Sequence, residues 1–82
     1  MKHKSRFLTA SIGYRLRELR NQRGISQEKL AELSGLHRTY IGACERGERN
    51  ITIVNLAVIC TNLGITLPEF FDNECFKANL FE

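Results

Sequence analysis

The sequence lacks the residue groupings on which most enzymes and metal proteins depend. Its three cysteines form no CxxC pair and it has only two histidines, so no metal-ligand spacing is present. It also has no clustered His, Asp and Cys set and no glycine loop of the kind that cradles phosphates. We therefore expect no catalytic activity, no metal and no cofactor.

Long hydrophobic runs are missing as well. No apolar stretch approaches the roughly 20 residues that a membrane-spanning helix needs, and the N-terminal MKHKSRFL lacks the apolar core of a signal peptide. An odd number of cysteines in such a chain argues for reduced thiols. These absences predict a cytoplasmic protein whose partner is neither a membrane nor a small-molecule substrate.

What the chain does have is an uneven distribution of charge. Eighty-two residues suffice for one small domain, which we assign to residues 1–82 with a basic leader at 1–8 and a short tail at 72–82. Residues 1–50 hold eleven Lys and Arg against five acidic residues, whereas residues 51–82 hold one Lys against four. This polarity favours a first part that meets a polyanion, with a merely solvated surface as the alternative.

The stretch SQEKLAELSGLHRTYIGACERGER, residues 26–49, indicates two short helices joined by a glycine turn. Ser26 is a good N-cap, and Gly35 can adopt the left-handed conformation that ends a helix. We predict helices at 27–34 and 38–46. This is a helix-turn-helix pattern, in which the second helix can enter a DNA major groove.

Three further helices are predicted, which makes the fold class all-α with five helices. Apolar residues at helical spacing place one at 9–23, with an earlier start capped by Ser5 as the alternative, in which the basic leader forms the first turn of this helix. Thr52 and Gly64 are cap residues around a helix at 53–63, and Thr66 caps the last helix.

The same residues carry a family resemblance. SQEKLAELSG followed by LHRTYIGACERGER resembles the lambda-repressor/Cro-like (Xre) family, and RTYI-x3-ER-x2-RN followed by ITI is similar to the controller proteins of restriction–modification systems. The similarity covers about residues 7–71. It implies a lambda-repressor-like helix-turn-helix domain and a transcriptional regulator that binds a palindromic double-stranded DNA operator as a homodimer. An antitoxin or phage-type repressor is the allied alternative, and a protein-interaction module is the alternative of another class.

The predicted base-reading residues lie on the second helix of the motif. Arg38, at its start, is placed to reach guanine O6 and N7 with its two-pronged guanidinium. Thr39 can offer a hydroxyl to a base and a methyl group to thymine. Gly42 and Ala43 are small and lie outward or flanking, which would let the helix backbone approach the groove closely.

Five residues are expected to contact the sugar–phosphate backbone: Gln27, Tyr40, Arg46, Arg49 and Asn50. The resemblance implies this role for Gln27 at a helix start and for the loop with Arg49 and Asn50. A solvated Gln27 is an equally weighted alternative, and the Tyr40 ring is expected to pack mainly in the core.

Arg20 lies at the edge of the apolar stripe of its helix, so its charge needs a partner. Glu45 is the candidate, and in the similar repressors the matching positions form a structural ion pair. Both residues are therefore assigned to the scaffold.

The last part of the chain carries more apolar surface than so short a segment can bury within itself. The resemblance implies that it forms the interface of the homodimer, for which we predict Ile65, Leu67, Phe70 and Phe71. A lid over the core is the alternative. Glu28 and Glu32 lie four residues apart on the outer face of their helix. The resemblance implies that such acids can contact RNA polymerase, as in related activators, but a plain solvent-facing surface is the favoured interpretation here.

Overall fold

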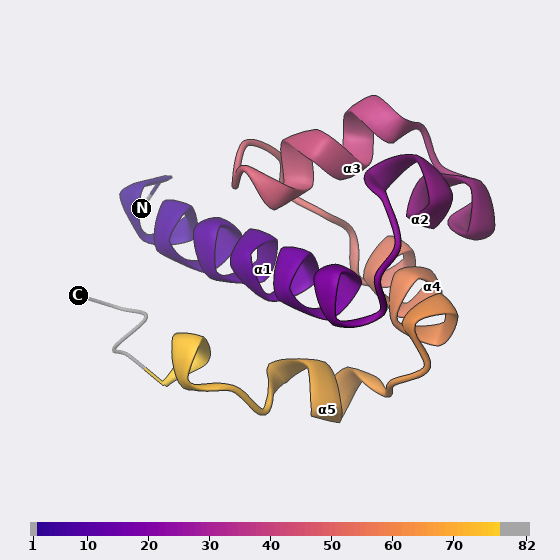
Figure 1. Ribbon diagram of the computed structural model, residues 1–82. Coiled ribbons are helices and arrows are strands. Elements are labelled where there is room, and N and C mark those ends of the chain that lie inside the picture. The colour runs from indigo at the N-terminus through magenta and orange to yellow at the C-terminus, as the bar shows by residue number, and fades with distance from the viewer. Residues whose placement is uncertain (1, 78–82) are drawn as a thin grey trace.

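The computed structural model describes residues 2–77, and every regular element in that range is a helix (Figure 1). The elements are α1 (Lys2–Gln22), α2 (Gln27–Ser34), α3 (Arg38–Glu45), α4 (Ile53–Leu63), α5 (Leu67–Phe71) and a 3-10 helix, η1 (Glu74–Phe76). The predicted all-α fold with five α-helices is confirmed. η1 was not predicted and falls in the predicted tail. The end of that tail, residues 78–82, lies outside the described residues.

The capping residues place most helix boundaries correctly. The Ser26 and Thr52 side chains each accept a backbone N–H from the first turn of their helix, both at 3.0 Å. Gly35 and Gly64 follow α2 and α4 with φ of 68° and 77°, the left-handed conformation that ends a helix. Both helices have the predicted bounds, whereas α3 ends at Glu45, one residue earlier than expected.

The predicted start of the first helix is wrong. α1 begins at Lys2 rather than at residue 9, and it ends at Gln22. Residues 2–8 contain no glycine or proline that would stop a helix, so the conformation extends through them. The predicted basic leader, apart from Met1, which is not described, therefore forms the first turns of α1.

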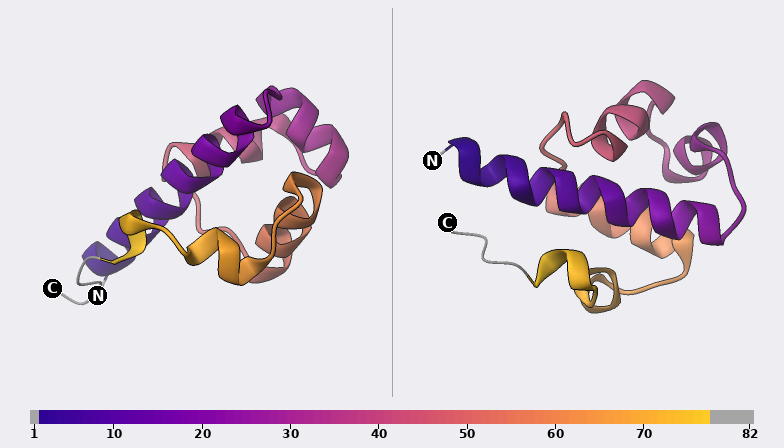
Figure 2. Two further views of the ribbon diagram at one scale, coloured as in Figure 1. Left: turned by 60° about the horizontal axis from the view of Figure 1, so that its bottom comes forward. Right: turned by 60° about the vertical axis from the view of Figure 1, so that its left-hand side comes forward.

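α1 runs between two groups of helices. α3 packs along one side of it and carries α2, while η1 packs on another side, which α5 also follows, as the different views show (Figures 1 and 2). The core between them is made of aliphatic side chains from α1 to α4, two cysteines and one aromatic ring. Its most deeply buried members are Leu16, Leu30, Ile41, Cys44, Leu56, Ile59, Cys60, Leu63 and Phe70.

Arg15 ties the end of α5 to α1. Its guanidinium donates to the carbonyl oxygens of Phe70 and Glu69 at 2.8 and 2.9 Å, and to the Glu18 carboxylate at 2.9 Å. The last carbonyls of a short helix have no partner within that helix, so Arg15 supplies donors that α5 cannot.

The assignment of Phe70 to a dimer interface is wrong. Its ring is completely buried within its own chain, where it packs against Phe71 and Phe76 with centroids 5.1 and 5.9 Å away. A side chain without exposed surface cannot meet a second subunit. Ile65, Leu67 and Phe71 are only partly buried, and their interface role stays a prediction.

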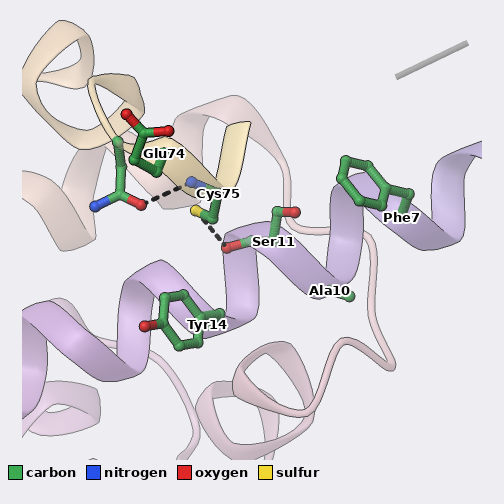
Figure 3. A pocket seen from close by; sticks show the side chains of 7 residues that line it. Phe7, Ala10, Ser11, Tyr14, Glu74 and Cys75 are labelled. Carbon is green, nitrogen blue, oxygen red and sulfur yellow. Dashed lines mark hydrogen bonds between the residues drawn. The ribbon is translucent and has the colours of Figure 1, made fainter. Parts of the chain in front are cut away.

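η1 packs beside the N-terminal half of α1 and leaves a hollow of about 560 Å³ there (Figure 3). Phe7 and Tyr14 border it from α1, and Cys75 borders it from η1, with Sγ 3.7 Å from the Ser11 carbonyl oxygen.

Of the helices within residues 2–77, none has the length and apolar character to cross a membrane.

Candidate nucleic-acid interface

The turn between α2 and α3 sets which side of α3 faces outward. Leu30 and Ala31 of α2 are buried together with Ile41 and Cys44 of α3. The side of α3 that does not take part in this packing faces solvent. His37 is the N-cap of α3, but its side chain makes no capping hydrogen bond.

The predicted base-reading residues lie on this outer side. Arg38 and Thr39 are exposed at the amino end of α3, and Ala43 is half-buried one turn later. A polar hollow of about 220 Å³ opens beside them, at the junction with the start of α2, and is lined by Gln27, Arg38, Thr39, Gly42 and Arg46. The structure therefore brings side chains from both helices of the motif to one concave polar surface.

Gly42 lies on this outer side and lines the hollow, but its backbone is not bare. It is buried, because the side chains of Gln27 and Arg46 lie over it. A Cβ at this position would lie 3.2 Å from Arg46 Nη1 and 3.4 Å from Gln27 Oε1. The small residue thus gives room to these two polar side chains, rather than baring the backbone of α3.

Arg38 is held by an acidic residue of α2. Its Nη1 lies 3.2 Å from Glu28 Oε2, and the two side chains remain 66% and 63% exposed. The pKa of the Glu28 carboxyl is lowered, first by a hydrogen bond from its own backbone amide and then by the charge of Arg38. An ion pair this exposed contributes little stability, so Arg38 can leave it for another acceptor. The sequence did not indicate this contact, because it joins residues across the turn of the motif.

Beneath the outer surface lies a buried network centred on Glu45. Arg20 donates to both carboxylate oxygens of Glu45, at 2.7 and 3.0 Å, and to the Ile25 carbonyl at 2.8 Å. The Glu45 side chain is 2% exposed. The hydrogen bond to Glu45 raises the pKa of Arg20 above its usual value, and burial opposes this in part. The pair joins α1 to α3 at the base of the site.

Gln27 belongs to the same network. Its Nε2 donates to Glu45 Oε1 at 2.9 Å, so its carboxamide is oriented by a buried acid at the foot of the polar hollow. Neither of the two roles weighed for Gln27, a phosphate contact or a solvated side chain, includes this bond. The second N–H of Nε2 is the donor that the carboxamide has left, since its Oε1 can only accept.

Tyr40 in the first turn of α3 and Arg49 in the loop after it form a second polar edge. The Arg49 guanidinium lies 5.0 Å from the centroid of the half-buried Tyr40 ring, within range of a cation–π contact. The Tyr40 hydroxyl accepts a hydrogen bond from Asn55 Nδ2 at 3.1 Å. Nothing in the sequence indicates this role for Asn55, because only the folding of α4 against the motif brings it to Tyr40.

The loop after α3 carries the remaining predicted backbone contacts. Arg46 pairs with Glu48 at 3.1 Å, and Arg49 and Asn50 are exposed.

Within the described part of the chain, no group of three or more His, Cys, Asp or Glu side chains is placed to hold a metal ion.

Comparison with known proteins identifies the fold and the motif. The helix-turn-helix family HTH_3 matches residues 16–70. The control protein C.SmaI of Serratia marcescens is 45% identical over 62 residues, which are 76% of this chain and 74% of that protein. The restriction–modification controller protein C.AhdI of Aeromonas hydrophila is 51% identical, with a TM-score of 0.75 over 77% of this chain and 96% of that one.

A further solved structure contains nucleic acid. It is the tetramer of the restriction–modification controller protein C.Esp1396I with its natural 35 base-pair operator, 38% identical, with a TM-score of 0.76 over 80% of this chain and 87% of that one. The motif, the fold and these relatives lead to one conclusion: the chain belongs to the HTH_3 helix-turn-helix family, and its relatives there include the controller proteins of restriction–modification systems.

Proposed function

We propose that the chain is a sequence-specific, double-stranded DNA-binding transcriptional regulator, the controller of a restriction–modification system. The observation that carries this proposal is the concave polar surface at the amino end of α3, where Arg38 and Thr39 are exposed. Its action is binding alone, in the cytoplasm, with no chemical reaction. The solved relative in complex with its operator supports the same use of the fold.

Two exposed side chains and one small one would read bases. Arg38 exchanges the Glu28 carboxylate for guanine O6 and N7, a bidentate contact worth about 1–3 kcal/mol of discrimination. Thr39 lies next to it and presents both a hydroxyl and a methyl group. Ala43 presents only a methyl group one turn later, which suits a close apolar contact with thymine.

The surrounding polar residues would position the protein on the duplex without selecting sequence. Gln27 and Arg46 border the hollow on either side of Gly42, and Arg49 with Asn50 extends the surface into the next loop. Tyr40 contributes through its hydroxyl and by supporting Arg49.

A homodimer would place two copies of α3 on successive turns of the duplex, about 34 Å apart. The structure leaves a large apolar surface on α4, where Ile53, Val54 and Val58 are 60%, 68% and 38% exposed. We propose that this face, together with Ile65, Leu67 and Phe71, forms the dimer interface. The surface on α4 was not among the predicted interface residues and replaces the buried Phe70.

Selection of bound duplexes from a random pool tests the proposal. We expect a palindromic consensus, because an isologous dimer presents two identical reading helices related by a two-fold axis. A bound pool without any consensus would reject sequence-specific regulation and favour a protein-interaction module. If a consensus is found, the neighbouring gene separates the two kinds of regulator. A restriction endonuclease gene favours a controller, and a toxin gene favours an antitoxin.

A further inference from the structure

A second polar hollow lies between the first half of α1 and the loop after α3. It measures about 190 Å³ and is lined by Arg6, Thr9, Gly47, Glu48, Arg49 and Asn50. The loop backbone packs directly on α1, since a Cβ on Gly47 would lie 3.1 Å from the Ala10 Cα. The early extension of α1 therefore reaches the loop that carries Arg49 and Asn50.

The groups around this hollow are mostly donors, and two arginines against one acid give them a positive balance of charge. Arg6 is exposed and has no carboxylate within ion-pair distance among residues 2–77. Glu48 is the acid present, and its charge is offset by Arg46 at 3.1 Å. In the same part of the chain, the backbone amides of Arg49 and Asn50 make no hydrogen bond. Such a set of N–H donors fits an anion with several acceptor oxygens.

We propose that this hollow binds a phosphodiester group of the DNA backbone. Arg6 supplies the principal positive charge, and the backbone amides of Arg49 and Asn50 supply neutral donors. The inference rests on the proposed function, and it adds α1 to a DNA surface otherwise built from α2, α3 and the loop. Arg6 lies before residue 16, where the family match begins, so this contact is a feature of this chain beyond the matched motif.

Replacing Arg6 tests the site through the salt dependence of binding. Each phosphate contact contributes about 0.9 to the slope of log K against log salt, so Arg6→Gln should lower the slope for a dimer by about 1.8. Affinities for the selected operator and for an unrelated duplex should fall by the same factor. Arg6→Lys, which keeps the charge, should retain the wild-type slope.

Arg23→Gln is the matched control, because it removes the same charge from the far end of α1, where the guanidinium packs against Gly64. It should leave the slope unchanged, and helix content measured by circular dichroism should be equal in all variants. An unchanged slope in Arg6→Gln, with specific binding intact, would overturn this inference and leave the proposed function standing. Failure of the wild-type protein to prefer any duplex would overturn both.

Discussion

Replacing Glu45 with alanine should lower the free energy of unfolding by about 3–5 kcal/mol. The substitution leaves the Arg20 guanidinium, whose side chain is 11% exposed, without the carboxylate that accepts two of its hydrogen bonds. It also deprives Gln27 of its acceptor. Because small domains are stable by only about 5–15 kcal/mol in total, this loss would unfold a substantial part of the population at moderate temperature.

Chemical denaturation followed by circular dichroism measures this effect. Glu32→Ala is the matched control, because its side chain is 73% exposed and its pairing with Lys29 is 3.5 Å long, so its cost should stay below about 1 kcal/mol. The double variant Arg20→Met with Glu45→Leu should recover much of the loss, since it removes both charges from the interior. If Glu45→Ala and Glu32→Ala lower the free energy of unfolding by the same amount, the buried pair is not what joins α1 to α3.

Gly13→Ala is the second change for which we expect a large effect, about 2 kcal/mol or more of lost stability. Gly13 is a buried residue of α1, and a Cβ there would meet the carbonyl oxygens of Cys44 and Glu45, the latter at 2.7 Å. These atoms are backbone, so they can give way only if α3 moves off α1. Overpacking of this kind costs about 1–3 kcal/mol or more and outweighs the gain of up to about 1 kcal/mol that alanine brings to a helix.

Gly42→Ala provides the contrast within the same protein. This glycine is also buried in a helix, but its neighbours are the ends of the Gln27 and Arg46 side chains, which can rotate away. We expect its unfolding midpoint in denaturant to be equal to or above that of the wild type. If Gly13→Ala proves as stable as Gly42→Ala, the close approach of α1 to the end of α3 is not a constraint on this fold.

Local signals in the sequence were sufficient for much of the fold. Ser26 and Thr52 predicted two helix starts because an N-cap satisfies donors within its own first turn, a property that depends on near neighbours alone. The Arg20–Glu45 pair is also present in the structure. The apolar stripe indicated only that Arg20 needs a partner, and the family resemblance implied that Glu45 is that partner.

Features that depend on distant contacts could not be predicted in this way. Phe70 looks like a surface residue from its position in a short apolar end, and only the packing of α5 beside α1 encloses it. Gly42 looks outward on a helical wheel, yet Gln27 from another helix covers it. The hollow at Arg6 joins segments about 40 residues apart, and no periodicity or motif in the chain indicates it.

Duplex selection repeated with Arg38→Ala is the most direct test of whether the amino end of α3 reads bases. We expect the variant to stay folded, since Arg38 is exposed, and to bind DNA still. It should lose its preference at one base pair in each half-site, at a cost of about 1–3 kcal/mol, while the rest of the consensus persists. A consensus identical to that of the wild-type protein would contradict the account.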